Sequence, residues 1–63
     1  MLVWAWVLVV LIKADGVERD WNSYYRAEEC VEVLKIITHH REDQIQARCE
    51  FKQIDTATQG EPR

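Results

Sequence analysis

Two cysteines and two histidines are the residues of this chain best suited to chemistry. Cys30 and Cys49 lack the paired C-x-x-C spacing of a zinc ribbon. His39 and His40 are adjacent, so on a helix they would point about 100° apart. Only one of them could share an ion with the two thiols, even with Asp43 nearby. We therefore expect no metal site and no cofactor.

Other catalytic arrangements are also missing from the sequence. Ser23 is the only serine, and Gly16 and Gly60 are the only glycines, so the chain has neither a serine-histidine-acid set nor a glycine-rich phosphate loop. Both cysteines fall on inward faces of the expected elements, where thiols are usually inert. We expect a protein that is not an enzyme and has no small-molecule substrate.

The composition describes a small folded chain with a mixed surface. It has 63 residues, 48% of them hydrophobic, and a formal charge of -3. No cationic cluster is present to displace phosphate counterions, so we expect no nucleic-acid partner. A chain of this length buries only about 60% of its unfolded surface, which favours help from a staple or a partner.

Residues 1–12 form an unbroken apolar run with three possible interpretations. Twelve helical residues reach about 18 Å, too short for about 30 Å of hydrocarbon. A secretory signal would need a basic start and a small-residue cleavage site, which the run lacks. Its valines, isoleucine and tryptophans favour a strand that is apolar on both faces.

The elements after this strand follow from local signals. Asp15 and Gly16 suit a hairpin turn, and residues 17–21 alternate as a second strand. Asn22 and Ser23 are expected to cap a helix over residues 24–40. Its inward arc is expected to hold Ala27, Cys30, Val31, Leu34 and Ile37.

Residues 45–52 alternate strictly between apolar and polar side chains, which predicts a strand with one buried face. We expect a single α+β domain over residues 1–54, with a polar and flexible tail at 55–63. Its three-stranded antiparallel sheet has the order 2-1-3, with the helix on one face. Cys30 then lies over Cys49, and the two could form a disulfide.

The expected fold leaves one face of the first strand uncovered. Exposed Trp, Leu and Val side chains on that face would predict a binding surface rimmed by charges. The predicted binding residues are Trp4, Trp6, Leu8, Val10, Arg48, Glu50 and Lys52. A secondary patch is expected at Tyr25, Val33 and Ile36.

Several local motifs together resemble the short phage-encoded proteins of strand-(strand)-helix-strand type. They are the apolar first strand, Trp21 with Ser23, Ala27-Glu28-Glu29-Cys30, and Ala47-Arg48-Cys49. The likeness covers about residues 1–52. It implies a viral protein of the host-takeover or anti-defence kind, an inhibitor that blocks or redirects a host protein by docking on it.

We accordingly expect a noncatalytic protein-binding module that uses its sheet face and edge strand. One alternative is a self-assembling structural or virion accessory protein, in which the partner is a second copy. The other is a secreted or membrane-associated protein with residues 1–12 as signal or anchor. The host cytoplasm is the expected location if the protein is phage-encoded.

Overall fold

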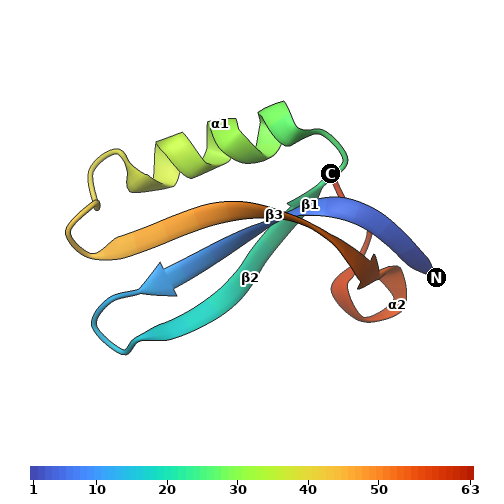
Figure 1. Ribbon diagram of the computed structural model, residues 1–63, viewed down its shortest axis with the longest axis horizontal. Coiled ribbons are helices and arrows are strands. Elements are labelled where there is room, and N and C mark those ends of the chain that lie inside the picture. Colours follow the sequence, from blue (N-terminus) through green and yellow to red (C-terminus); the bar gives the residue numbers. More distant parts are fainter.

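The computed structural model describes residues 1–63 as a three-stranded sheet with one long helix. The elements are β1 (Leu2–Ile12), β2 (Val17–Tyr24), α1 (Ala27–Thr38), β3 (Ile45–Asp55) and the short α2 (Thr56–Gln59). The strands pair antiparallel in the order β2-β1-β3, and α1 packs on one face of the sheet (Figure 1). The predicted fold class and strand order are confirmed.

β1 is the central strand, as its apolar residues on both faces predict. Leu8 and Val10 turn toward α1 and pack with Cys30 in one buried cluster. Val7 and Val9 turn to the opposite face and pack with residues of a second cluster. β1 is the only strand that pairs with both β2 and β3. Neither helix of the structure has the length and apolarity needed to cross a bilayer.

The hairpin between β1 and β2 has the predicted turn chemistry. Gly16 adopts a positive φ of 70°, and its N–H donates to the carbonyl of Ile12 at 2.8 Å. The Asp15 carboxylate accepts a 3.0 Å hydrogen bond from the Val17 N–H. A side chain at position 16 would strain this conformation, which explains the glycine.

The helix begins later than the sequence predicts. β2 continues to Tyr24, whose side chain is buried, so Asn22 and Ser23 are strand residues and not helix caps. The residue at the cap position is Arg26, which makes no side-chain capping hydrogen bond. Burial of the tyrosine against the core outweighs the local capping preference of the two polar residues.

The buried arc of α1 also differs from the prediction by one position. Cys30 is fully buried, and the other helix residues packed on its cluster are Val33, Leu34 and Ile37. Val31, which was predicted to face inward, is 41% exposed at the side of the helix. Val33, predicted as part of a surface patch, occupies the inward position instead.

β3 confirms the predicted alternation and brings the cysteines together. Its pairing with β1 runs without a bulge from Ile45 opposite Ile12 to Asp55 opposite Leu2. Cys49 lies opposite Leu8 on the helix side of the sheet. It forms a disulfide with Cys30, with a Cα–Cα distance of 6.2 Å. The bond fastens α1 to β3.

Residues 55–63 are folded back onto the sheet, which differs from the predicted flexible tail. The Asp55 carboxylate caps α2 by accepting from the Ala57 N–H at 2.9 Å. Arg63 then pairs with the edge of β2, donating to the Ser23 carbonyl at 2.9 Å and accepting from the Tyr25 N–H at 3.1 Å. Pro62 beside it is buried. The tail is therefore part of the fold.

Candidate protein-binding edge

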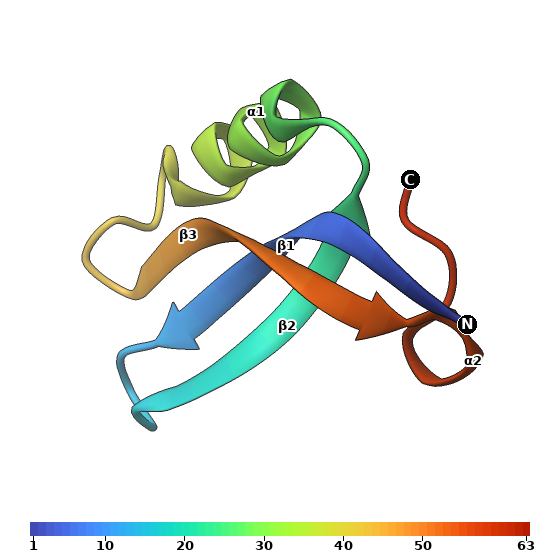
Figure 2. The same ribbon diagram turned by 45° about the vertical axis from the view of Figure 1, so that its right-hand side comes forward.

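The sheet face opposite α1 carries the apolar residues that the sequence predicted would need a partner. Figures 1 and 2 show only the short α2 and the chain that follows it on this side. Nevertheless Ala5, Val7 and Val9 are at most 3% exposed. The expectation that folding one copy leaves an apolar stripe of β1 open on this face is wrong.

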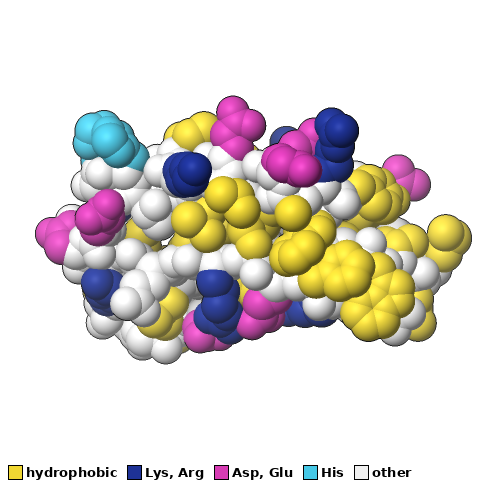
Figure 3. All heavy atoms as spheres, turned by 45° about the horizontal axis from the view of Figure 1, so that its top comes forward, with side chains coloured by type: hydrophobic (Ala, Val, Ile, Leu, Met, Phe, Trp, Pro, Cys, Tyr) yellow, Lys and Arg dark blue, Asp and Glu magenta, His cyan; other side chains and the backbone are white.

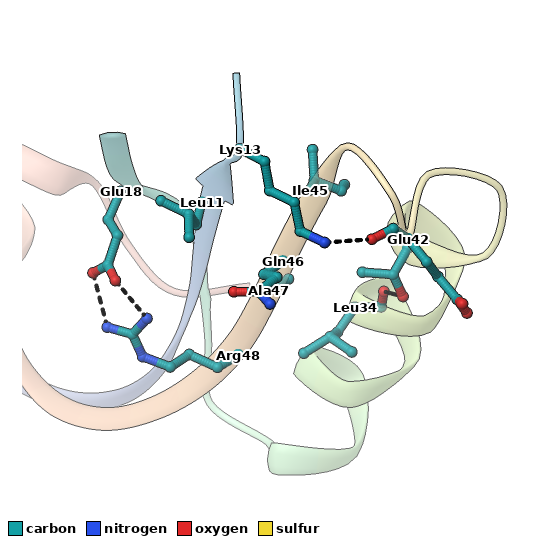
Figure 4. Close-up of a pocket in the computed structure, with 10 residues that line it drawn as sticks. Leu11, Lys13, Glu18, Leu34, Glu42, Ile45, Gln46, Ala47 and Arg48 are labelled. Carbon is teal, nitrogen blue, oxygen red and sulfur yellow. Dashed lines mark hydrogen bonds and ion pairs between the residues drawn. The ribbon is translucent and has the colours of Figure 1, made fainter. Parts of the chain in front are cut away.

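Charged side chains from both neighbouring strands and the C-terminal segment, which crosses from β3 to the β2 edge, account for this burial. Arg48 of β3 donates two hydrogen bonds to the Glu18 carboxylate of β2, at 3.0 and 2.9 Å. Lys52 of β3 lies 3.1 Å from the Asp20 carboxylate of β2. β1 lies between β2 and β3, so both ion pairs cross above β1. The alkyl stems of Arg48 and Lys52 then cover the valines of β1 on this face. Figure 4 shows the Arg48–Glu18 pair beside Leu11 of β1.

The paired geometry also fixes the charge state of this face. The two hydrogen bonds from the Arg48 guanidinium, and then its positive charge, hold the pKa of Glu18 below the ordinary value of 4.5. The hydrogen bonds that Arg48 donates to Glu18 and Glu50 raise the pKa of Arg48. Glu50 accepts from the Arg48 Nε at 2.7 Å. The Glu18 carboxylate is ionised at neutral pH, and the face is polar to solvent.

The seven predicted binding residues do not form one surface. Trp6, Leu8 and Val10 point to the α1 side, where Leu8 and Val10 are buried. The β1–β3 register places Arg48, Glu50 and Lys52 on the opposite face of the sheet. Only Trp4 is a large apolar member of the set that is mainly exposed, at 58%.

The predicted secondary patch is also divided. Tyr25 and Ile36 are exposed, as predicted, but Val33 packs on the core. Tyr25 precedes the first turn of α1 and Ile36 lies in its last turn, so about three helical turns separate them. Ile36 instead lines an apolar hollow with Trp21 of β2.

The residues best suited to chemistry are separated in the structure. Both cysteines are in the disulfide, and the rings of His39 and His40 contact each other just after α1, with centroids 4.2 Å apart. No group of three or more His, Cys, Asp or Glu side chains is arranged to hold a metal ion.

The outer edge of β3 is the open hydrogen-bonding surface of the sheet. At the two ends of the β1–β3 ladder, Lys13 donates to the Gln44 carbonyl and Thr56 donates to the Met1 carbonyl, each at 2.9 Å. Backbone groups in an antiparallel ladder alternate in direction. The even-numbered residues of β3 therefore bond to β1, and the odd-numbered residues present N–H and C=O groups outward. Between Ala47 and Gln53 these outward groups have no protein partner.

An exposed apolar band lies beside this edge on the α1 side. Phe51 of β3 is 54% exposed and stacks on Trp4, with ring centroids 5.4 Å apart. Leu2 extends the surface at 60% exposure, and Val31 of α1 adds to it. We call these four residues the apolar band. Figure 3 shows hydrophobic side chains running along α1 and broadening toward the end of the molecule that holds the N-terminus.

The two edges of the sheet differ in their protection. Arg63 occupies the β2 edge at Ser23 and Tyr25 and leaves the rest of that edge unpaired, whereas no segment of this chain pairs with any part of the β3 edge. An open edge next to exposed apolar side chains is the arrangement through which a sheet accepts another strand. Sequence reasoning noted open edges but did not identify β3 or Phe51, because it assigned Phe51 to a buried face. No sequence signal indicated this exposure, since a helix over residues 24–40 would be about as long as the strand over 45–52. In the structure the 12 residues of α1 rise about 18 Å, whereas the 11 residues of β3 span about 36 Å.

Comparison with family models, with curated proteins and with solved structures finds no match to this chain.

Proposed function

We propose that this protein is a noncatalytic binding module that holds a protein partner by strand addition to the β3 edge. The observation that carries the proposal is the row of outward backbone groups from Ala47 to Gln53 lying beside the apolar band. An added strand would satisfy these groups, and its side chains on the α1 side would cover Phe51 and Trp4.

Of the sheet face and edge strand predicted from the sequence as binding surfaces, the proposed binding role keeps the edge strand and not the face opposite α1. The face is polar, because the pairs Arg48–Glu18 and Lys52–Asp20 cover it. That the partner is a host protein, which a phage-like protein would inhibit, stays a prediction.

Capture experiments with matched variants test the proposal. The tagged protein is used as bait in a bacterial lysate that also contains a differently tagged copy of the same chain. Phe51→Glu places a charge in the apolar band, and Ile36→Glu places the same charge at a residue that is 68% exposed on the other side of α1.

We expect Phe51→Glu to remove the captured protein and Ile36→Glu to retain it. Both variants should keep the circular dichroism of the wild type, since neither residue is buried. A bait that captures nothing above background, or that keeps its partner when Phe51 is replaced, contradicts the proposal.

A further inference from the structure

The backbone groups and side chains of the β3 edge suit pairing with the same edge of a second copy. This inference rests on the proposed function. We propose that the strand added to β3 is the β3 strand of a second copy, antiparallel and centred on Cys49. Two copies would then form one continuous six-stranded sheet with both α1 helices on the same face. The register follows from charge, from side-chain size and from the position of α1.

Charge favours this register over its neighbours. Centring on Cys49 places Arg48 opposite Glu50 of the second copy, twice across the two-fold axis. Because odd-numbered residues point their backbone groups outward, Arg48 and Glu50 meet at a non-hydrogen-bonded position, where opposed side chains are closest. Centring on Glu50 would oppose two glutamates and place Arg48 against Lys52, which repels.

Side-chain size favours it as well. With Cys49 at the centre, Phe51 of each copy lies opposite Ala47 of the other, so a large ring meets a small side chain. Centring on Phe51 would also pair opposite charges, Glu50 with Lys52, but it would oppose the two phenyl rings and place Arg48 beside Ile54.

The position of α1 also favours pairing of two β3 strands centred on Cys49. Leu34 and Thr38 line a hollow with Ala47 and Arg48, which shows that this side of the helix faces the β3 edge. Val31 precedes Leu34 by three residues and so shares this side. Figure 4 shows Leu34 directed toward β3.

The disulfide holds α1 above Cys49, the residue on the proposed axis. α1 packs on residues of both β1 and β3, so its axis lies about half a strand spacing inward of β3. With neighbouring strands about 5 Å apart, the α1 helices of the two copies come within about 10 Å of each other, a usual packing distance. Val31, which is 41% exposed in one copy, then meets Val31 of the other. The same pairing covers the free backbone groups and the Phe51 and Val31 side chains of the apolar band.

Sedimentation over a wide concentration range tests self-pairing. Glutamate substitutions on opposite sides of α1 show which side is needed. We expect the wild type and Ile36→Glu to form dimers and Val31→Glu to remain a monomer with an unchanged circular dichroism spectrum. A wild type that stays monomeric at every concentration overturns the inference, as does a Val31→Glu variant that dimerises normally.

Nuclear magnetic resonance on a mixture of labelled and unlabelled chains tests the register. Phe51 and Ala47 are four residues apart on one extended strand, a separation of about 13 Å. A nuclear Overhauser contact between the Phe51 ring and the Ala47 methyl group therefore arises only between copies in this register. Contacts from Phe51 to Phe51 of the second copy would instead overturn it.

These results also separate this inference from the proposed function. A monomeric protein that captures another polypeptide through Phe51 refutes self-pairing and leaves strand addition standing. A monomeric protein that captures nothing refutes both.

Discussion

Arg48 and Glu18 belong to strands on opposite sides of β1, yet their side chains meet above it with two hydrogen bonds of 3.0 and 2.9 Å. Together with the Lys52–Asp20 pair and the C-terminal segment, this pair covers the apolar central strand on the face that α1 leaves free. It explains how a chain with an unbroken apolar run exposes a mainly polar sheet face. The backbone N–H and C=O groups on the outer edge of β3 remain without a partner.

The Arg48–Glu18 pair predicts a loss of stability in acid. Because the folded-state pKa of Glu18 is below its ordinary 4.5, the pair contributes fully above that pH and loses its contribution as the pH falls from 4.5 through the folded-state value. Urea unfolding midpoints at neutral and acid pH measure this change. Glu18→Gln should show a smaller difference between the two conditions, and an equal difference would contradict the assignment.

Leu8 of β1 is fully buried beneath α1, so replacing it tests the packing of the core. Leu8→Ala removes three carbon atoms from a packed site and should lower the free energy of unfolding by about 2 to 5 kcal/mol. Chemical denaturation measures this loss. Leu2→Ala is the matched control, since Leu2 is 60% exposed on the same strand, and it should have a much smaller effect.

The disulfide predicts that the free energy of unfolding depends strongly on redox conditions. It closes a loop between residues 19 positions apart, and its removal should lower the free energy of unfolding by roughly 3 kcal/mol. Unfolding of the wild type with and without reductant measures the effect, and a Cys30→Ser, Cys49→Ser double variant should match the reduced protein. An unchanged midpoint under reductant would show that the bond is absent in solution.

The folded tail predicts that truncation destabilises the domain. Deleting residues 60–63 removes the two backbone hydrogen bonds of Arg63 and the buried Pro62. We expect a loss of about 1 to 3 kcal/mol, since each such bond contributes roughly 1 kcal/mol. Thermal unfolding of the truncated chain checks this. A chain as stable as the full length would support the flexible tail predicted from the sequence.

Strong periodic signals in the sequence predicted most of the fold. The alternation from Ile45 to Lys52, the apolar first strand and Asp15-Gly16 together defined the strand order, and the helix arc placed Cys30 over Cys49. The start of the helix was wrong because capping preferences at Asn22 and Ser23 are local. Tertiary burial of Tyr24 outweighs them.

The binding surface was predicted less well, because it depends on contacts across strands. Sequence periodicity separates Arg48 and Lys52 from the apolar residues of β3, but it does not show that they reach Glu18 and Asp20 over β1. Nor does it show where a short helix stops covering a longer strand. The exposure of Phe51 follows from that difference in length.

Residue-resolved amide hydrogen exchange along β3, measured at low and high protein concentration, tests the central claim most directly. At low concentration the account predicts fast exchange at Ala47 and Phe51, whose N–H groups point outward, and slow exchange at Arg48 and Glu50, which bond to β1. At high concentration Ala47 and Phe51 should become protected while Arg48 and Glu50 stay unchanged. Equal protection of odd and even residues at both concentrations would contradict an open β3 edge that accepts a strand.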